Sequence, residues 1–333
     1  MSRNTLRRQG LALLVLLAVC TVPVTGLLAG VSGAATKPAT KAAPGTGRAK
    51  TSSLHAAPTA KPVATRTHRT RYHGRRRTPP GGVVWARNAI VLDPANGDVL
   101  YEKNSGASAP CASLTKMMTA LVFLERKPDL DRSVEVTPAE LTGGGHTQLR
   151  RGEHVRLDDL LHMSLMSSDN VATRVLVRES GMPLEDFLAR MNRRAVELGL
   201  ARTRFVEVTG LDERNVSTAA DIARLLQAAA ENPTIHDITT QRGYDFLSYS
   251  ATNRVRTHHI ATTNRLLYGQ YEIQGGKTGH ISEAGYCLAT WIRTDQRDMI
   301  AVVLGAPTNA TRFADVVRLV QHTNSMSVAP RGL

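Results

Sequence analysis

The sequence predicts an α+β domain in which an antiparallel sheet is flanked by helices. The first observation is the order of patterns along the chain: strand patterns open the domain over 83–103, helical periodicity fills 114–230, and strand patterns return over 272–304. The second is composition, because 42% hydrophobic residues in a chain of 333 can form a sizeable core. The sheet must therefore join segments from distant parts of the chain and carry helices on its faces.

The opening segment predicts a β-hairpin. Residues 83–92 are rich in β-branched side chains, residues 93–98 (Asp-Pro-Ala-Asn-Gly-Asp) are typical of a turn, and residues 99–103 continue as a second strand. Helices are expected where apolar residues recur with helical spacing, over 114–125, 157–166, 171–179, 183–198 and 219–230. After Asn264, strands are expected over 272–274, 277–281, 285–293 and 299–304, followed by an amphipathic helix over 309–325.

The positive charge of the chain is concentrated in its first 80 residues. The sequence has 42 Lys and Arg against 28 Asp and Glu, and residues 1–80 hold 14 of the basic residues and none of the acidic ones. Residues 81–333 therefore hold 28 of each sign and are neutral. A neutral body argues against a domain-wide nucleic-acid surface, so we expect no nucleic acid as partner. The order of strand and helix patterns described above indicates one domain over 81–333.

The first 35 residues have the three parts of a signal peptide. Three arginines within the first eight residues precede an apolar stretch over 11–28, and small residues follow at 32–35. The alternatives are a membrane anchor of about 20 apolar residues and a lipoprotein anchor at Cys20. Pro23, Gly26 and the small residues favour cleavage. We expect an exported protein, in the periplasmic or cell-wall space and soluble after cleavage.

Residues 36–80 predict a disordered basic linker. They are rich in Ala, Thr, Pro, Lys and Arg and contain hardly any large apolar side chain, so burial cannot offset the entropy cost of ordering them. The most basic stretch is 68–77. It has two interpretations: a solvated tail, or an electrostatic tether to anionic polymers of the cell envelope.

Cysteine and histidine content excludes several kinds of site. Because Cys20 lies in the leader, Cys111 and Cys287 are the only cysteines of the body, which rules out a disulfide framework and a four-cysteine zinc site. These two can still pair, since an exported protein meets an oxidising environment. His258 and His259 have no third ligand at a convincing spacing, so we expect a surface loop there, no metal and no cofactor.

Three short motifs follow one another along the body. Ser113-Leu114-Thr115-Lys116 lies at the expected start of a helix, Ser168-Asp169-Asn170 lies between two expected helices, and Lys277-Thr278-Gly279 opens an expected strand. Each motif alone has an ordinary explanation, as a helix cap, a turn between helices or an edge strand. Together and in this order they are the set found in penicillin-binding proteins and serine β-lactamases.

The first two motifs suit nucleophilic catalysis. Ser113 is a weak nucleophile that needs a base, and Lys116 returns to the same helix face one turn later. A lysine acts as a base only when burial and a second cation lower its pKa, and Lys277 is the candidate cation. Ser168 offers a hydroxyl that relays a proton to the leaving group. Asn170 offers an amide to a substrate peptide bond or to Lys116.

The third motif suits substrate binding. Lys277 and Thr278 supply a charge and a hydroxyl for a substrate carboxylate. Gly279 removes side-chain bulk, so that substrate can lie against the strand edge. The backbone N–H groups of Ser113 and His280 are candidates for an oxyanion hole, and the N-terminus of the helix adds positive potential where the Ser113 alkoxide develops.

With these motifs the chain resembles the low-molecular-mass penicillin-binding proteins, which are D-alanyl-D-alanine carboxypeptidase/endopeptidase serine peptidases. The resemblance covers roughly 84–322. Beyond the motifs it is carried by the segments 110–119, 208–211 with 215–219, and 276–280 with 283–288. It implies the β-lactamase/transpeptidase-like fold, peptidoglycan peptides as substrate, and β-lactam antibiotics as covalent inhibitors. It also implies an acyl-enzyme at Ser113, with Lys116 as base and Lys277 as carboxylate binder.

Two features bear on which bond is cut. Larger members of the group carry a second β-rich domain and a C-terminal membrane helix, whereas this sequence ends at Leu333, soon after its closing helix, as in the smaller soluble endopeptidases. Carboxypeptidases of the group often have Ser-Gly-Asn-Asp as their second motif. In this sequence the motif is Ser168-Asp169-Asn170, and the next residue is Val171. Carboxypeptidase and endopeptidase activity therefore both stay open.

Two other functions are weighed against these peptidases. A β-lactamase would need a carboxylate that drives deacylation, and no Glu-x-x-Leu-Asn follows the second motif. Glu207 lies instead in a segment that resembles the peptidases. A non-catalytic wall-binding module would use the basic leader, but it would not need an intact set of nucleophile motifs.

Overall fold

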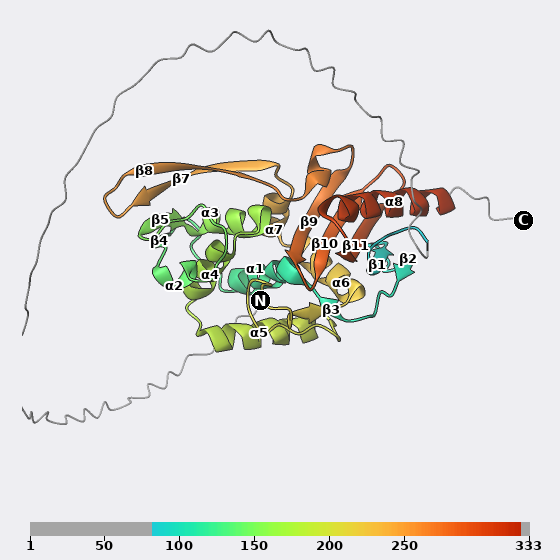
Figure 1. The fold of residues 1–333 in the computed structure, drawn as a ribbon, viewed down its shortest axis with the longest axis horizontal. Coiled ribbons are helices and arrows are strands. Elements are labelled where there is room, and N and C mark those ends of the chain that lie inside the picture. The colour runs from blue at the N-terminus through green and yellow to red at the C-terminus, as the bar shows by residue number, and fades with distance from the viewer. Residues whose placement is uncertain (1–81, 328–333) are drawn as a thin grey trace, which may run out of the picture. The chain divides into compact units, whose positions relative to one another are not determined.

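Strands from the two ends of the domain form one antiparallel sheet, as the sequence predicts. The computed structural model describes residues 82–327, which leaves the expected signal peptide (1–35) and linker (36–80) outside the described residues. The sheet has the order β2-β1-β11-β10-β9 (Figure 1). Its strands are β1 (Asn88–Leu92), β2 (Val99–Lys103), β9 (Glu272–Ile281), β10 (Gly285–Arg293) and β11 (Asp298–Ala306).

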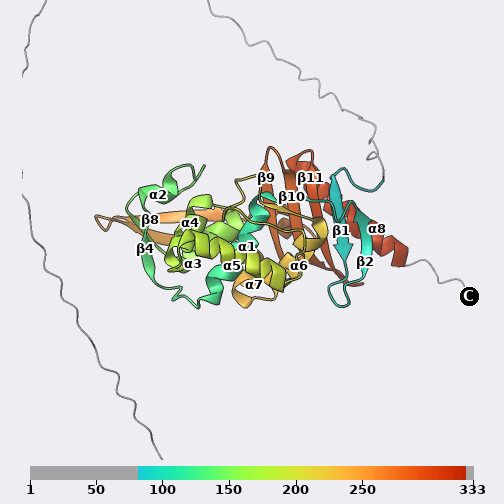
Figure 2. The ribbon, with the colours of Figure 1, turned by 90° about the horizontal axis from the view of Figure 1, so that it is seen from below.

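Helices cover both faces of this sheet. Side chains alternate along β11, so Val302 packs in the cluster that contains α6 (Ala219–Ala230), whereas Val303 packs in the cluster that contains α8 (Asn309–Ser327). Figure 2 shows α6 and α8 on either side of β10 and β11. The remaining α-helices are α1 (Thr115–Glu125), α2 (Pro138–Leu141), α3 (Leu157–His162), α4 (Asn170–Glu179), α5 (Leu184–Glu197) and α7 (Pro233–Thr239).

The helix α1 is the buried centre of the helical part. Every residue from Thr115 to Phe123 is buried, and the helix packs against α4, α5 and α6. A helix that is apolar on all sides is typical of a position inside a core. Lys116, in its first turn, is therefore carried into the interior with its apolar neighbours.

A second sheet has the order β4-β5-β7-β8, and its long hairpin extends away from the first sheet (Figure 1). Two strands of two residues each, β3 (Ala109–Pro110) and β6 (Val216–Ser217), pair with each other, and β3 directly precedes the segment that contains Ser113. The strands of the second sheet are β4 (Ser133–Glu135), β5 (Glu153–Arg156), β7 (Gly243–Ser250) and β8 (Val255–Ala261). The expectation that strands resume only after Asn264 was therefore wrong.

The predicted surface loop at His258 and His259 is also wrong, because both residues lie on β8. His258 is 1% exposed, and its Nε2 lies 2.6 Å from a carboxylate oxygen of the buried Glu153 and 2.9 Å from Ser248 Oγ. Arg256 Nη1 donates to the same carboxylate at 2.9 Å. This buried polar cluster ties the hairpin to β5, and residues 82–327 contain no group of three His, Cys, Asp or Glu arranged to hold a metal ion.

Several predicted elements keep their predicted bounds. The helix over 219–230 and the strand over 285–293 match α6 and β10, and β1 pairs with β2 as the opening hairpin. The two strands predicted on either side of Gly275 are one continuous strand, β9. Lys277 therefore lies in the middle of a strand and does not open it.

The two body cysteines do not form a disulfide. Cys111 and Cys287 are both buried and free, and burial raises the pKa of Cys111 to about 12 and that of Cys287 to about 11. Cys111 instead donates through Sγ to the Asn215 carbonyl at 3.3 Å. Within 82–327, none of the helices combines the length and apolar character needed to span a bilayer.

Candidate active site

A strained turn presents Ser113 at the start of α1. Ala112, directly before it, has φ +48°, a left-handed conformation that costs about 1–2 kcal/mol for a residue with a side chain. The chain then forms a 3-10 turn over Ala112–Leu114 and enters α1 without a side-chain cap. The hydroxyl of Ser113 is thus not used as a helix cap. Its Oγ accepts a hydrogen bond of 2.9 Å from Lys116 Nζ.

Lys116 is buried and makes three hydrogen bonds. Its Nζ donates to Ser113 Oγ at 2.9 Å, to Asn170 Oδ1 at 2.6 Å and to the Thr209 carbonyl at 2.6 Å. The residue has 0% exposure, and burial lowers the pKa of Lys116 to about 7 because a desolvated ammonium is unfavourable. A large fraction of this lysine is therefore neutral near pH 7 and able to take a proton from Ser113.

The charges around Lys116 differ from the sequence-based expectation. Glu207 and Asp169 raise the pKa of Lys116, whereas Arg174 lowers it, and burial outweighs all three. Sequence reasoning missed Arg174, one turn after Asn170 on α4, as a cation that lowers the pKa of Lys116. Burial and then the charge of Lys116 lower the pKa of Lys277 itself.

The second motif is held by the junction between two helices. Ser168 has φ +64° and follows a π-helical turn over Met163–Ser167. The helix predicted over 157–166 therefore consists of α3 and this π-helical turn. Asp169 is the N-cap of α4, its Oδ1 accepts from Ala172 N at 3.0 Å, and burial raises the pKa of its carboxyl. Asn170 Nδ2 donates to the Gly144 carbonyl at 3.0 Å, which turns its oxygen toward Lys116.

The third motif lies on β9, the edge strand of the five-stranded sheet. Lys277 is 1% exposed, and its Nζ donates to Ser168 Oγ at 2.7 Å and to the Thr278 carbonyl at 3.0 Å. Thr278 Oγ1 lies 2.6 Å from Thr263 Oγ1. His280 is exposed, and its ring stacks on the Tyr286 ring with centroids 4.0 Å apart.

The structure gives Gly279 a role that sequence reasoning did not predict. A Cβ built at Gly279 would lie 3.1 Å from Ser113 N, 3.1 Å from Ala112 Cβ and 3.2 Å from the Cys111 carbonyl oxygen. The missing side chain therefore lets the nucleophile turn approach the strand. The close approach places Ser113 N beside β9, the arrangement that an oxyanion hole shared with His280 N requires.

The structure brings the three motifs together in two hydrogen-bonded groups. Lys116 joins Ser113 to Asn170, and Lys277 reaches Ser168. Sequence reasoning missed Arg312 on α8, which is 6% exposed and donates through Nη1 to the carbonyls of Gly279 and Cys287 at 3.0 and 3.1 Å. Its positive charge lies behind β9 and contributes to the low pKa of Lys277.

Sequence reasoning also missed the role of the segment between α5 and α6. The carboxylate of Glu207 accepts from Thr209 N and Oγ1, both at 2.7 Å, from Gly210 N, and from Asn215 Nδ2 at 3.0 Å. Both oxygens are engaged within the protein. Glu207 is thus not free to hold a water for deacylation, which argues against a β-lactamase.

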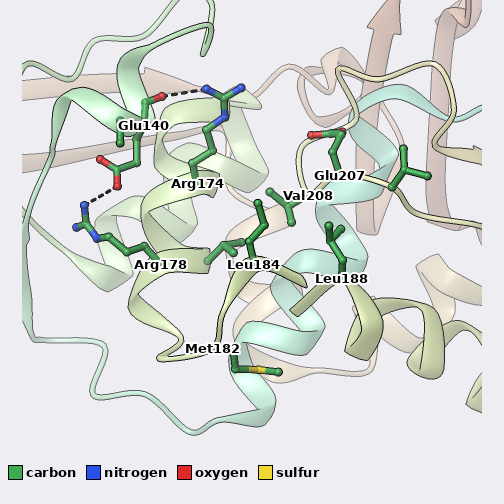
Figure 3. Close-up of a pocket in the computed structure, with 11 residues that line it drawn as sticks. Glu140, Arg174, Arg178, Met182, Leu184, Leu188, Glu207 and Val208 are labelled. Atoms are coloured by element: carbon green, nitrogen blue, oxygen red, sulfur yellow. Dashed lines mark hydrogen bonds and ion pairs between the residues drawn. The ribbon is translucent and has the colours of Figure 1, made fainter. Parts of the chain in front are cut away.

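A pocket of about 530 Å³ adjoins this segment (Figure 3). Val177 of α4 and Leu184 and Leu188 of α5 form part of its apolar wall, and Figure 3 shows Glu207 at the side opposite Glu140. None of the eight predicted site residues lines this pocket. It is therefore separate from the hydrogen-bonded centre around Ser113, although Glu207 belongs to its wall.

Comparisons of sequence agree with this geometry. Residues 75–308 match the profile of a family described as D-alanyl-D-alanine carboxypeptidase. The D-alanyl-D-alanine endopeptidase of Escherichia coli (strain K12) is 33% identical over 246 residues, which are 73% of this chain and 78% of that protein. The D-alanyl-D-alanine endopeptidase of Pseudomonas aeruginosa is 36% identical over 237 residues, which are 70% of this chain and 75% of that protein.

Comparisons of structure confirm the predicted fold class. The crystal structure of the Streptomyces K15 DD-transpeptidase matches with a TM-score of 0.70 and 25% identity, over 75% of this chain and 100% of that one. Penicillin-Binding Protein D2 from Listeria monocytogenes, in its cefotaxime-bound form, matches with a TM-score of 0.61 and 27% identity, over 74% of this chain and 99% of that one. The chain belongs to the D-alanyl-D-alanine carboxypeptidase family of penicillin-binding serine peptidases, which act on peptidoglycan peptides.

Proposed function

We propose that Ser113 is the nucleophile of this peptidase and Lys116 its general base. The observation that carries the proposal is the buried Lys116 amine, which lies 2.9 Å from Ser113 Oγ and has a pKa of about 7. A neutral amine at this distance takes the hydroxyl proton as Oγ attacks the carbonyl carbon of a D-alanyl residue. The N–H groups of Ser113 and His280 then donate to the developing oxyanion.

Collapse of the tetrahedral intermediate breaks the peptide bond and leaves an ester on Ser113. The leaving nitrogen takes up the proton that Lys116 removed from Ser113, relayed through the hydroxyl of Ser168, which a hydrogen bond of 2.7 Å from Lys277 holds in place. Water then hydrolyses the ester and regenerates Ser113. A β-lactam follows the same first step, but its opened ring stays attached to Ser113, which makes it a covalent inhibitor.

Lys277 and Thr278 are proposed to bind the substrate carboxylate, with Asn170 donating to the substrate backbone. Burial lowers the pKa of Lys277, and an incoming carboxylate would raise it again, which favours the charged ammonium. Arg312, behind the same strand, adds a cation that favours an anion at this position. No cofactor is part of this proposed mechanism.

We propose further that the chain is an endopeptidase that cuts cross-links between peptidoglycan stems. The support is the likeness to two proteins named as endopeptidases, at 33% and 36% identity. The test is incubation of the full chain with purified cross-linked muropeptide dimers and with monomeric pentapeptide muropeptides. Monomers released from the dimers support the endopeptidase. Free D-alanine from the pentapeptide with intact dimers would make the chain a carboxypeptidase.

The proposed location is outside the cytoplasmic membrane. The support is that residues 1–35 contain a charged start, then an apolar stretch, then small residues, and that the basic segment 36–80 follows them. N-terminal sequencing of exported protein should begin near Ala35 or Thr36, whereas an intact Met1 in a membrane fraction would indicate an anchor. The proposed tether is tested by sedimentation of the protein with anionic wall polymers. Sedimentation of the full chain that is lost when the residues up to about Arg77 are removed would support the tether.

A further inference from the structure

We propose that Glu207 is a positioning residue for the reaction of Ser113. Its carboxylate fixes the segment 206–215, and this segment holds both Lys116 and the turn at Ala112. The proposal rests on the proposed function, in which Ser113 is the nucleophile and Lys116 its base. It assigns to Glu207 no contact with substrate.

The segment folds around one carboxylate. Glu207 accepts four hydrogen bonds, from Thr209 N, Thr209 Oγ1, Gly210 N and Asn215 Nδ2. Hydrogen bonds to a charged acceptor are roughly twice as strong as those between neutral groups. Asn215 strengthens the same fold, because its Oδ1 accepts from Glu207 N at 3.1 Å. The backbone at Thr209 and Gly210 therefore has one well-defined position.

That backbone is docked on the face of α1 that carries the catalytic lysine. The Thr209 carbonyl accepts from Lys116 Nζ at 2.6 Å, and the Val208 carbonyl accepts from Thr119 Oγ1 at 2.6 Å. Lys116 and Thr119 are three residues apart and so lie on the same side of the helix. Two successive carbonyls thus fix the segment against α1 and fix the direction of the lysine amine.

The same segment supports the nucleophile turn from both sides. A Cβ at Gly210 would lie 1.9 Å from the Ala112 carbonyl oxygen, so the glycine backbone is in direct contact with the strained turn. The Asn215 carbonyl accepts from Cys111 N at 3.0 Å, and Asn215 Nδ2 donates to Thr115 Oγ1 at 3.1 Å. The residues before and after Ser113 are therefore both tied to groups that Glu207 orders.

The charge of Glu207 gives the proposal a signature that simple structural support lacks. The charged groups that face Lys116 are Asp169 and Arg174 from α4, Glu207 from this segment, and Lys277 from β9. The charge of Glu207 raises the pKa of Lys116. Neutralising Glu207 should therefore lower that pKa, while the loss of its hydrogen bonds disturbs the position of the amine.

Glu140 provides a matched control in the wall of the same pocket (Figure 3). Its carboxylate is 5% exposed and forms an ion pair with Arg178 at 2.6 Å. It also accepts from Thr137 at the start of α2. It is a buried, fully engaged carboxylate that does not act on Lys116.

The experiment measures the rate of acylation by a fluorescent penicillin against pH for the full chain and three variants. Glu207→Gln should lower the plateau rate about 10–100-fold and move the acid limb of the profile to lower pH. Glu207→Asp keeps the charge but cannot reach all four donors, so its plateau should fall while its acid limb stays in place. Glu140→Gln should lower the melting temperature and change neither the plateau nor the limb.

Three outcomes would overturn the positioning role. They are an unchanged plateau in Glu207→Gln, an acid limb of Glu207→Gln that coincides with that of the wild type, and an equal shift in Glu140→Gln. Should Glu207→Gln fail to fold, Glu207→Asp still decides, because an unchanged plateau there contradicts the proposal. A wild-type profile without an acid limb, or labelling that persists in Ser113→Ala, would contradict the proposed function instead.

Discussion

Replacing Gly210 by alanine should displace the nucleophile turn. Gly210 has φ +88°, and a Cβ there would lie 1.9 Å from the Ala112 carbonyl oxygen and 2.7 Å from Ser113 N. Since real Cβ atoms stay at least 3.0 Å from such atoms, one of the two segments has to move by about the difference, roughly 1.1 Å. The backbone carbonyl of a strained turn cannot rotate away as a flexible side chain can.

Both activity and stability should respond to this displacement. A shift of about 1 Å in reacting groups can cost about 100-fold in rate, so we expect acylation by penicillin to fall by that factor. A left-handed alanine costs about 1–2 kcal/mol, and overpacking adds about 1–3 kcal/mol. For a domain of this size the melting temperature should fall by on the order of 10 °C. Stopped-flow acylation and thermal unfolding measure the two effects.

Gly97→Ala separates conformational strain from the clash. Gly97 has φ +77°, close to that of Gly210, but a Cβ there meets nothing within 4 Å. It lies in the turn between β1 and β2, so only the conformational cost of about 1–2 kcal/mol applies. Acylation should be unchanged in Gly97→Ala. Equal acylation rates in Gly210→Ala and Gly97→Ala would refute the reasoning.

Three other substitutions test the electrostatics of the site by penicillin labelling against pH. Lys116→Arg should abolish acylation, because a guanidinium cannot give up its proton. Lys277→Arg keeps a cation and its donors and should retain measurable acylation; equal loss in both variants would contradict the assigned roles. Asn170→Asp places a carboxylate where the amide oxygen lies 2.6 Å from Lys116 Nζ. The new carboxylate favours the protonated form of Lys116. The acid limb of the pH profile, near pH 7 in the wild type, should therefore move up by about 1–3 pH units. An unmoved limb would mean that the limb does not report the titration of Lys116.

The fold class was predictable because its signals are local. Strand patterns at both ends of the body and helical periodicity between them correspond to β1, α6 and β10, and the predicted bounds of α6 and β10 match those of the structure. The order of these patterns then required a sheet built from distant segments. The pairing of β1 with β11 confirms that requirement.

The hairpin of β7 and β8 was not predictable from periodicity. Two of its inward positions are Ser248 and His258, which interrupt the alternation of apolar and polar residues that marks a strand. These polar groups are buried only because Glu153 satisfies them, and Glu153 lies 95 and 105 positions away along the chain. A local pattern carries no trace of such a partner.

The candidate site divides in the same way. The motif residues carry chemistry in their side chains, so their types and order indicated Ser113, Lys116 and Lys277. The contribution of Thr209 to the site is a backbone carbonyl, which any residue type can supply. The depressed pKa of Lys116 comes from burial, and its neighbours in sequence do not reveal how completely α1 is enclosed.

The central claim is that penicillin and substrate are attacked by Ser113. The most direct measurement incubates the full chain and Ser113→Ala with benzylpenicillin, digests both with trypsin, and maps the adduct by tandem mass spectrometry. Trypsin cuts after Lys103 and Lys116, so Ser113 lies in the peptide 104–116. We predict one penicilloyl adduct on Ser113 in the wild type and none in Ser113→Ala, whose melting temperature should be nearly unchanged. An adduct on another residue, or one that persists in Ser113→Ala, would contradict the account.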